Sequence, residues 1–459
     1  MENANKISRR GFLKSSSIAG LYGALGTTGA IAAASSLTSC GKKEKNPLIP
    51  LKKPEEYYIP ALTDMAIDGK PLKAGVIGCG GRGSGAAFNF LNAANDVTIT
   101  AIGDVFPDKI NELRDKLKAE KNIDIPAENC FTGLDAYQKV IDSDVDVVIC
   151  ATPPVFRPEH FRYAVEKGKH AFLEKPICVD SVGYRTIMAA SRQAAAKKLS
   201  VVTGTQRHHQ RPYVESYKKI MEGYIGDITG GNVYWNGDVP WYRYPKKEWS
   251  DAECMIRDWV NWKWLSGDHI VEQHVHNIDV FTWFSGLKPA KCIAFGSRQR
   301  RITGDQFDNF SVDFIMENGI HLHSMCRQIP GCANNVSEFI QGTRGSWSSG
   351  DGCKIKDLAG NIIWEFNAEA EKEQFQQTDP YTLEHVNWIS HIRSGNPINQ
   401  AEETLVANLA AIMGREAAYT GQEINWDAIM AAPMDIIPAD LAMKGKMNMK
   451  QFTVTVPGK

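Results

Sequence analysis

The chain of 459 residues lacks several features that mark particular classes of protein. It has no excess of basic side chains, because 52 lysines and arginines stand against 53 aspartates and glutamates. A positively charged surface for nucleic acid is therefore not expected. Its ten cysteines include no C-x-x-C pair, which argues against a disulfide framework and against a zinc cluster. No internal repeat is present, so we expect a globular protein. The charge balance and the cysteine spacing predict neither a nucleic-acid partner nor a metal.

Acidic residues are also absent between Ser8 and Cys40. This stretch begins with SRRGFLK, a twin-arginine export signal, and continues through an Ala/Gly-rich segment at 18–34 that is too short and too weakly apolar for a permanent membrane span. It ends in LTSC, which resembles a bacterial lipobox and implies a lipid on Cys40. We expect residues 1–39 to be a signal and the protein to be periplasmic, exported already folded, with a lipid anchor as its only membrane contact. The alternative is a cytosolic protein with a basic, frayed N-terminus.

The remaining 420 or so residues exceed what one hydrophobic core usually organises. As far as Thr203, short apolar runs such as VDVVICA at 145–151 alternate with helical segments, which predicts a doubly wound parallel sheet. From about Thr229 the strands alternate polar and apolar residues, and Asn318-Gly319 forms a hairpin turn, which predicts an open, mainly antiparallel sheet. The predicted fold class is α/β plus α+β. The expected divisions are a tether and arm at 40–72, a first domain at 73–205, a second at 206–400, and a C-terminal helix and tail at 401–459.

A glycine-rich loop follows the first predicted strand. In VIGCGGRGSG, Gly78, Gly80 and Gly83 fit the G-x-G-x-x-G pattern at the start of a helix. These glycines permit a tight turn, close approach of a pyrophosphate, and close packing of helix on strand. Asp104, 21 residues beyond Gly83 at the end of the next strand, suits the ribose hydroxyls of NAD and would repel the 2′-phosphate of NADP. We predict a Rossmann domain that binds NAD. The alternative is an ordinary glycine-rich turn and strand-terminal aspartate.

Two further motifs join this loop: Glu174-Lys175-Pro176 and the stretch from Glu272 to Asp279. At these three places the chain resembles the Gfo/Idh/MocA oxidoreductase family, over residues 73 to 419. The resemblance implies that Lys175 reaches both the nicotinamide and a substrate hydroxyl, and that His276 is the histidine of the family's Asp-x-x-x-His pair. Glu272 stands where the aspartate is usual, so its role is open. The residues assigned to the cofactor are Gly78, Gly80, Gly81, Arg82, Gly83, Asp104, Thr152, Pro153, Glu174 and Lys175.

The chemistry of alcohol oxidation explains why such residues are needed. Removing hydride from a carbinol carbon requires a base for the hydroxyl proton, and His276 is the candidate because imidazole titrates near neutrality. Lys175 would stabilise the developing alkoxide. Glu272, four residues before His276, would lie on the same helix face and orient the ring or bind a neighbouring hydroxyl. With His274 these residues also suggest a metal site, but residues two apart on a helix point to different faces.

Aromatic residues gather in the second domain. Six of the eleven tryptophans fall between Trp235 and Trp264, and aromatic faces suit the apolar faces of sugar rings. An aromatic core or subunit interface is the alternative. The residues assigned to a carbohydrate substrate are Arg207, His208, Trp241, Tyr242, Tyr244 and His274.

Export and a dinucleotide site together constrain the function. Free NAD is scarce outside the cytoplasm, so the enzyme should keep its cofactor and recycle it in place. We expect oxidation of a glycoside hydroxyl, at C3, to a ketone, followed by reduction of a second molecule. Two alternatives are a glycosidase that resembles glycoside hydrolase family 109 and acts by transient C3 oxidation, and a receptor that binds NAD without turnover. The family resemblance also implies a homo-oligomer.

Overall fold

The computed structural model describes residues 47–458, and residues 48–459 form one compact unit. The predicted export signal and Cys40 lie outside the described residues. Among the helices of the described part, none has the length and apolar character needed to cross a membrane.

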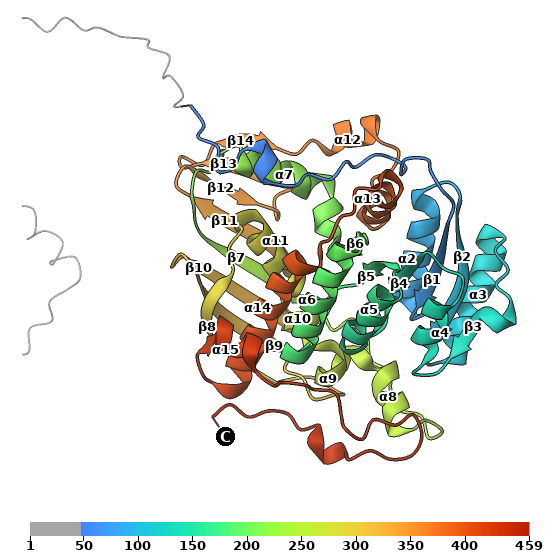
Figure 1. Ribbon diagram of the computed structural model, residues 1–459. Coiled ribbons are helices and arrows are strands. Elements are labelled where there is room, and N and C mark those ends of the chain that lie inside the picture. Colours follow the sequence, from blue (N-terminus) through green and yellow to red (C-terminus); the bar gives the residue numbers. More distant parts are fainter. Residues whose placement is uncertain (1–46, 459) are drawn as a thin grey trace, which may run out of the picture. The chain divides into compact units, whose positions relative to one another are not determined.

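The first sheet consists of six parallel strands in the order β3-β2-β1-β4-β5-β6 (Figure 1). Its central strands are buried on both faces, and all four residues of β4 are inaccessible to solvent. This explains their continuous apolar sequences. From β1 the next strands are added on one side of the sheet, and from β4 they are added on the other side. Parallel sheets bind ligands at such a switch point, here between β1 and β4. The strands are β1 Leu72–Ile77, β2 Val97–Asp104, β3 Cys130–Thr132, β4 Val147–Cys150, β5 His170–Leu173 and β6 Val201–Thr203. The helices between them are α2 Gly81–Ala93, α3 Pro107–Lys121, α4 Ala136–Asp142, α5 Arg157–Glu166 and α6 Ser181–Ala196.

The second sheet has nine strands in the order β14-β13-β12-β11-β7-β10-β9-β8-β15. Only the β7–β10 pairing is parallel among these strands, so the expected mainly antiparallel sheet is confirmed. The predicted hairpin joins β9 to β10, where Gly319 has φ +86°. The strands are β7 Ile228–Gly237, β8 Pro289–Ser297, β9 Asn309–Met316, β10 His321–Gln328, β11 Asn335–Gly342, β12 Gly345–Ser348, β13 Lys354–Asp357, β14 Ile362–Glu365 and β15 Ile424–Asn425.

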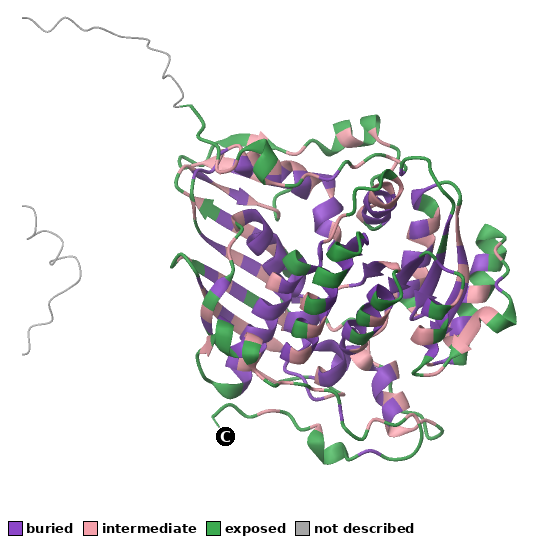
Figure 2. Cartoon of the chain, in the orientation of Figure 1, coloured by how far each residue is buried: buried purple, intermediate pink, exposed green. Residues whose placement is uncertain are grey.

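Two late helices close the body. Helix α14, Ala401–Thr420, packs against β8, α11 and α6, and it is buried on nearly all sides because it lies between the two sheets. Helix α13, Pro380–Ser394, packs on α2 of the first domain. Figure 2 shows the buried residues concentrated in both sheets and α14. The remaining helices are α7 Arg211–Met221, α8 Asp251–Arg257, α9 Lys263–Ser266, α10 His269–Glu272, α11 Val275–Ser285, α12 Ala368–Gln374 and α15 Trp426–Ala431. Short 3-10 turns are η1 Pro54–Glu56, η2 Ala127–Asn129, η3 Pro154–Phe156, η4 Gln206–His209, η5 Trp259–Asn261 and η6 Met449–Gln451.

The helix expected to carry both Glu272 and His276 is broken, which corrects the sequence-based prediction. Helix α10 ends at Glu272 and α11 begins at Val275. At the break the backbone N–H of His274 donates to the carbonyl of His269, five residues back, at 3.1 Å. The extra residue in that turn removes the regular i,i+4 relation. Glu272 and His276 therefore do not share one helix face.

Both ends of the compact unit pack on its surface. In the arm, Tyr57 makes an edge contact with Tyr217 at 5.6 Å between ring centroids, and the Tyr58 hydroxyl donates to Asn387 at 2.8 Å. The C-terminal tail after α15 passes beneath α8 (Figure 1), where the backbone N–H of Met447 donates to Asp251 at 2.9 Å. The tail is thus part of the packed structure.

Candidate active site

The glycine loop has the geometry of a pyrophosphate cradle. Gly78 has φ +91°, and a Cβ there would meet the backbone N of Thr152 at 2.7 Å. A Cβ at Gly83 would lie 1.7 Å from the carbonyl oxygen of Gly78. Gly80 and Gly81, in contrast, have no atom within 4 Å of an added Cβ, so the space over the start of α2 is open to a ligand. These are the three roles that the fingerprint requires.

Replacing Gly83 by alanine should abolish nucleotide binding and destabilise the first domain. The added methyl would collide with backbone, which has no rotamer by which to yield, so we expect a loss of about 2 kcal/mol or more in the free energy of unfolding. Urea unfolding and the nucleotide content of purified protein measure both effects. Gly237→Ala is the control, because no atom lies within 4 Å of its added Cβ. Equal stability and equal nucleotide content in the two variants would contradict the packing argument.

Asp104 lies at the carboxyl end of β2, beside the loop. Its carboxylate accepts the backbone N–H of Cys79 at 2.7 Å and that of Phe106 at 2.9 Å. Burial raises the pKa of Asp104, and these two hydrogen bonds oppose the rise. Each carboxylate oxygen keeps a lone pair for a further donor, so the group can accept ribose hydroxyls as predicted.

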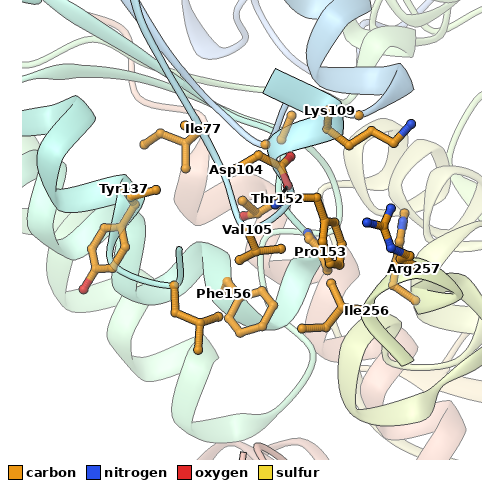
Figure 3. Close-up of a pocket in the computed structure, with 18 of the residues that line it drawn as sticks. Ile77, Asp104, Val105, Lys109, Tyr137, Thr152, Pro153, Phe156, Ile256 and Arg257 are labelled. Atoms are coloured by element: carbon orange, nitrogen blue, oxygen red, sulfur yellow. Dashed lines mark hydrogen bonds between the residues drawn. The ribbon is translucent and has the colours of Figure 1, made fainter. Parts of the chain in front are cut away.

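A cavity of about 480 Å³ opens over the loop, within the range of small-molecule sites. Seven residues assigned to the cofactor line it: Gly78, Gly80, Gly81, Arg82, Asp104, Thr152 and Pro153. Figure 3 shows Asp104, Thr152 and Pro153 among the lining side chains, with Ile256 and Arg257 entering from a segment of the second domain. Glu174 is not in the lining. It forms an ion pair with Arg82, which does line the cavity, and so holds that side chain in place. These residues fit an NAD molecule.

Lys175 and Glu272 are brought into direct contact. Lys175 follows the end of β5, next to the end of β4 where Thr152 lies, and the Lys175-Pro176 peptide is cis. The Lys175 Nζ donates to the backbone carbonyl of Glu272 at 2.5 Å and to its Oε1 at 3.0 Å. Both side chains are nearly buried, at 13% and 7% exposure. Glu272 therefore holds Lys175, and its predicted contact with the His276 ring is not formed.

His276 lies near this pair, at the start of α11. Its ring stacks on Trp235 of β7 with centroids 5.8 Å apart and planes 22° apart. Burial first, and then the positive charges of Lys175, Arg207 and His208, hold the pKa of His276 well below its usual value. The imidazole is therefore neutral at physiological pH and has a lone pair that can accept a proton.

Three residues assigned to the substrate have buried side chains that pair with other side chains of the protein. His208 Nε2 bonds to Asp279 at 2.8 Å and its ring stacks on Trp283. His274 Nε2 bonds to the Ser324 hydroxyl at 2.7 Å, with the ring fully buried. Arg207 donates to buried Glu338 at 2.5 Å. Buried polar side chains form hydrogen bonds with one another, because a buried polar group without a partner lowers the free energy of unfolding.

The three aromatic residues assigned to the substrate differ in their surroundings. Trp241 lines the nucleotide cavity, Tyr242 is half-buried, and Tyr244 is 62% exposed on the surface. The residue placed beside His276 is Trp235, which sequence analysis counted in the cluster without assigning it a role. The suggested metal site is not assembled: among the described residues, no group of three His, Cys, Asp or Glu side chains is arranged to hold a metal ion.

Comparison with known proteins supports the NAD-binding fold. Residues 72–205 match the sequence model of the family described as "Oxidoreductase family, NAD-binding Rossmann fold". An inositol 2-dehydrogenase/D-chiro-inositol 3-dehydrogenase from Lactiplantibacillus plantarum is 26% identical over 50% of this chain and 57% of its own length. A glycosyl hydrolase family 109 protein from Streptomyces coelicolor is 28% identical over 35% of this chain and 33% of its own. The matches thus span about a third to just over half of these relatives.

Solved structures show the same fold. Scyllo-inositol dehydrogenase from Lactobacillus casei, with bound NAD(H) and scyllo-inositol, superposes with a TM-score of 0.58 at 21% identity, covering 78% of this chain and all of that one. The fold and the glycine-loop geometry of residues 72–205 are those of an NAD-binding Rossmann domain. Within the chain, residues 72–205 are thus similar to the nucleotide-binding domain of the Gfo/Idh/MocA family.

Proposed function

We propose that this protein is an NAD-dependent oxidoreductase that oxidises a ring hydroxyl of a carbohydrate, with the C3 hydroxyl of a glycoside as its substrate group and a keto-glycoside as its product. The observation that carries the proposal is the grouping of Lys175, Glu272 and neutral His276 at the carboxyl end of β5, one strand from the lining of the NAD cavity. The inositol dehydrogenase relatives support a polyol or sugar substrate.

The side chains of this group have distinct tasks. NAD⁺ bound in the cavity would accept the hydride that leaves the carbinol carbon. The Lys175 ammonium has three N–H donors, of which Glu272 takes two, so one remains to hold the substrate oxygen and stabilise its developing charge. Neutral His276 accepts the hydroxyl proton. Because its pKa is low, the protonated ring returns that proton readily when a ketone is reduced in the reverse direction.

Trp235 provides the surface on which a sugar ring would rest. Its indole lies nearly parallel to the His276 ring, on a strand of the rigid second sheet. Flat aromatic faces pack against the apolar face of a pyranose, so an indole beside the candidate base would favour a ring-shaped substrate. This placement supports a cyclic substrate over an extended one.

The proposed periplasmic location rests on the sequence alone. The twin-arginine motif and the lipobox-like LTSC ending at Cys40 support export in the folded state to the periplasm, lipid anchoring at Cys40, and hence a cofactor retained between turnovers. Fractionation of cells that express the Arg9→Lys, Arg10→Lys variant tests this, with retention in the cytoplasm expected. The homo-oligomer implied by the family stays a prediction.

A second candidate is a glycosidase that oxidises C3 transiently, eliminates the aglycone and adds water. Such a reaction needs a further proton donor, and Tyr381 is a specific candidate. Its ring lies 4.6 Å from the Arg82 guanidinium and it is 38% exposed. Burial, chiefly, raises the pKa of its phenol, so the proton is retained for donation. The family 109 relative supports this alternative.

Incubation with aryl and natural glycosides separates the two. A keto-glycoside together with bound cofactor that absorbs as NADH supports the oxidoreductase. Release of the free sugar without an accumulating ketone supports the glycosidase, and Tyr381→Phe should then block release while leaving reduction of the bound cofactor intact. Absence of both products with every sugar tested would contradict both activities.

A further inference from the structure

The nucleotide cavity has a second wall that does not come from the Rossmann domain. Residues 238–262, which we call the clamp segment, run from the end of β7 through α8 to the start of α9. Six of its side chains line the cavity: Trp241, Arg243, Trp249, Ile256, Arg257 and Trp259. Figure 3 shows Ile256 and Arg257 on the side of the cavity formed by this segment. The clamp segment of the second domain therefore contributes side chains to the nucleotide cavity of the Rossmann domain.

Arg257 fastens the clamp segment to the Rossmann domain. Its guanidinium donates to both carboxylate oxygens of Asp108, at 2.9 and 3.1 Å. The same group stacks 3.9 Å from the ring centre of Phe106 and 4.9 Å from that of Trp249. Phe106 and Asp108 come two and four residues after Asp104, so these contacts lie beside the carboxylate assigned to the ribose.

The C-terminal tail fastens the clamp segment from outside. Asp251, at the start of α8, accepts the backbone N–H of Met447 at 2.9 Å and the Lys446 ammonium at 3.2 Å. The Ser250 hydroxyl donates to the carbonyl of Met443 at 3.1 Å. Met447 is buried in an apolar cluster that includes residues of α8 and Phe106. Helix α8 can move away from the cavity only if these contacts with the tail break.

The clamp segment also carries a positive charge suited to an anion. Arg243 lines the same cavity as Gly80 and Gly81, is exposed, and stacks over Trp241 at 4.9 Å. Within residues 47–458, no carboxylate lies within ion-pair distance of its guanidinium, whereas Arg257 is paired with Asp108 and Glu253. The guanidinium of Arg243 donates to the carbonyl of Tyr242, at 3.4 Å. An arginine without a carboxylate partner, in the same cavity as the glycine loop, suits the charge of a phosphate group.

We propose that the clamp segment binds the ADP-ribose half of NAD, with Arg243 pairing with the pyrophosphate and Trp249 and Arg257 closing over the adenosine, and that the C-terminal tail holds this wall shut. The inference rests on the cofactor retention proposed above and assigns it to named residues. The nucleotide is then held between two domains and leaves only when the tail and α8 move together.

The first test measures ADP-ribose and adenosine binding by titration calorimetry, on protein freed of nucleotide. Arg243→Ala should weaken ADP-ribose binding by at least about tenfold, as expected for loss of a charged hydrogen bond, and leave adenosine binding unchanged. Lys247→Ala is the matched control, because it removes an equal charge from the same segment outside the cavity lining. Equal ADP-ribose affinity in Arg243→Ala and Lys247→Ala would overturn the assignment of Arg243.

The second test measures how fast bound NAD is released. A chain ending at Ala432, or the Asp251→Ala variant if the shortened chain fails to fold, should release NAD at least about tenfold faster than the full chain, because the clamp loses its outer contacts. Release at the full-chain rate would overturn the role of the tail. Neither test involves a sugar, so a protein that oxidises no glycoside but shows both effects would contradict only the proposed function.

Discussion

Replacing Lys175 by methionine is expected to lower kcat by about 10²- to 10³-fold while bound NAD stays at its normal content. Methionine keeps much of the length and apolar stem but removes the ammonium that would face the substrate oxygen. Loss of one such preorganised donor costs about 3 to 4 kcal/mol of transition-state stabilisation. NAD content should not change, because Lys175 lies outside the lining of the nucleotide cavity. Single-turnover reduction of bound NAD⁺ by the glycoside measures the rate.

Two variants make this test specific. Lys167→Met removes an exposed lysine that pairs with Asp142 at 2.7 Å, far from Glu272, and should leave the rate unchanged. Glu272→Gln keeps the backbone carbonyl that accepts from Lys175 and loses only the ion pair, so its loss of kcat should be smaller than that of Lys175→Met. A Lys175→Met enzyme as fast as the wild type would contradict the role assigned to Lys175, whereas no reduction of bound NAD⁺ in either protein would favour an NAD-bound receptor.

Replacing His276 by asparagine is expected to lower kcat by about 10²- to 10⁴-fold, the usual contribution of a general base. Asparagine preserves a polar side chain beside Trp235 but cannot take the hydroxyl proton at neutral pH. His323→Asn is the matched control, since His323 lies on β10 and bonds only to Ser311 among the described residues. Equal losses in both variants would indicate a structural effect and contradict the assignment.

The pH dependence provides a second readout for His276. The neutral imidazole is the active form, and burial and three neighbouring positive charges hold its pKa well below 6.5. Activity that needs the neutral ring is present above this lowered pKa and lost only as the pH falls through it. The rate of the wild-type enzyme should therefore stay level from about pH 8 to about pH 6, without the inflection near 6.5 of an ordinary histidine. An inflection at that point would assign the base to another group.

Patterns of local origin were predicted well from the sequence. The hairpin of β9 and β10 forms around the predicted Asn318-Gly319 turn, because strict alternation and an Asn-Gly turn define a hairpin by themselves. The glycine loop was also predicted, since its three steric roles depend on neighbours close in the chain or on the adjoining strand.

Placements that depend on distant partners were not evident from the sequence. Trp241 was assigned to a sugar on its residue type, and the structure places it in the lining of the glycine-loop cavity, against Trp259. His274 was assigned to the substrate from its position between Glu272 and His276, and its ring is fully buried and bonds to Ser324 on β10. One signal was available: Trp241, Trp249 and Arg257 lie in one short segment with strong capacity for stacking, which suits adenine as well as sugar.

The amino-acid sequence by itself determined the class of fold, the identity of the nucleotide and the residue types available for alcohol oxidation, because these depend on periodicity and on short motifs whose geometry is local. Only the tertiary structure decided that Glu272 holds Lys175, that His276 stands against Trp235, and that the second domain and tail close the nucleotide cavity. Those contacts join residues about 40 to 200 positions apart. Their partners are selected by the packing of two sheets around α14, which no stretch of sequence encodes alone.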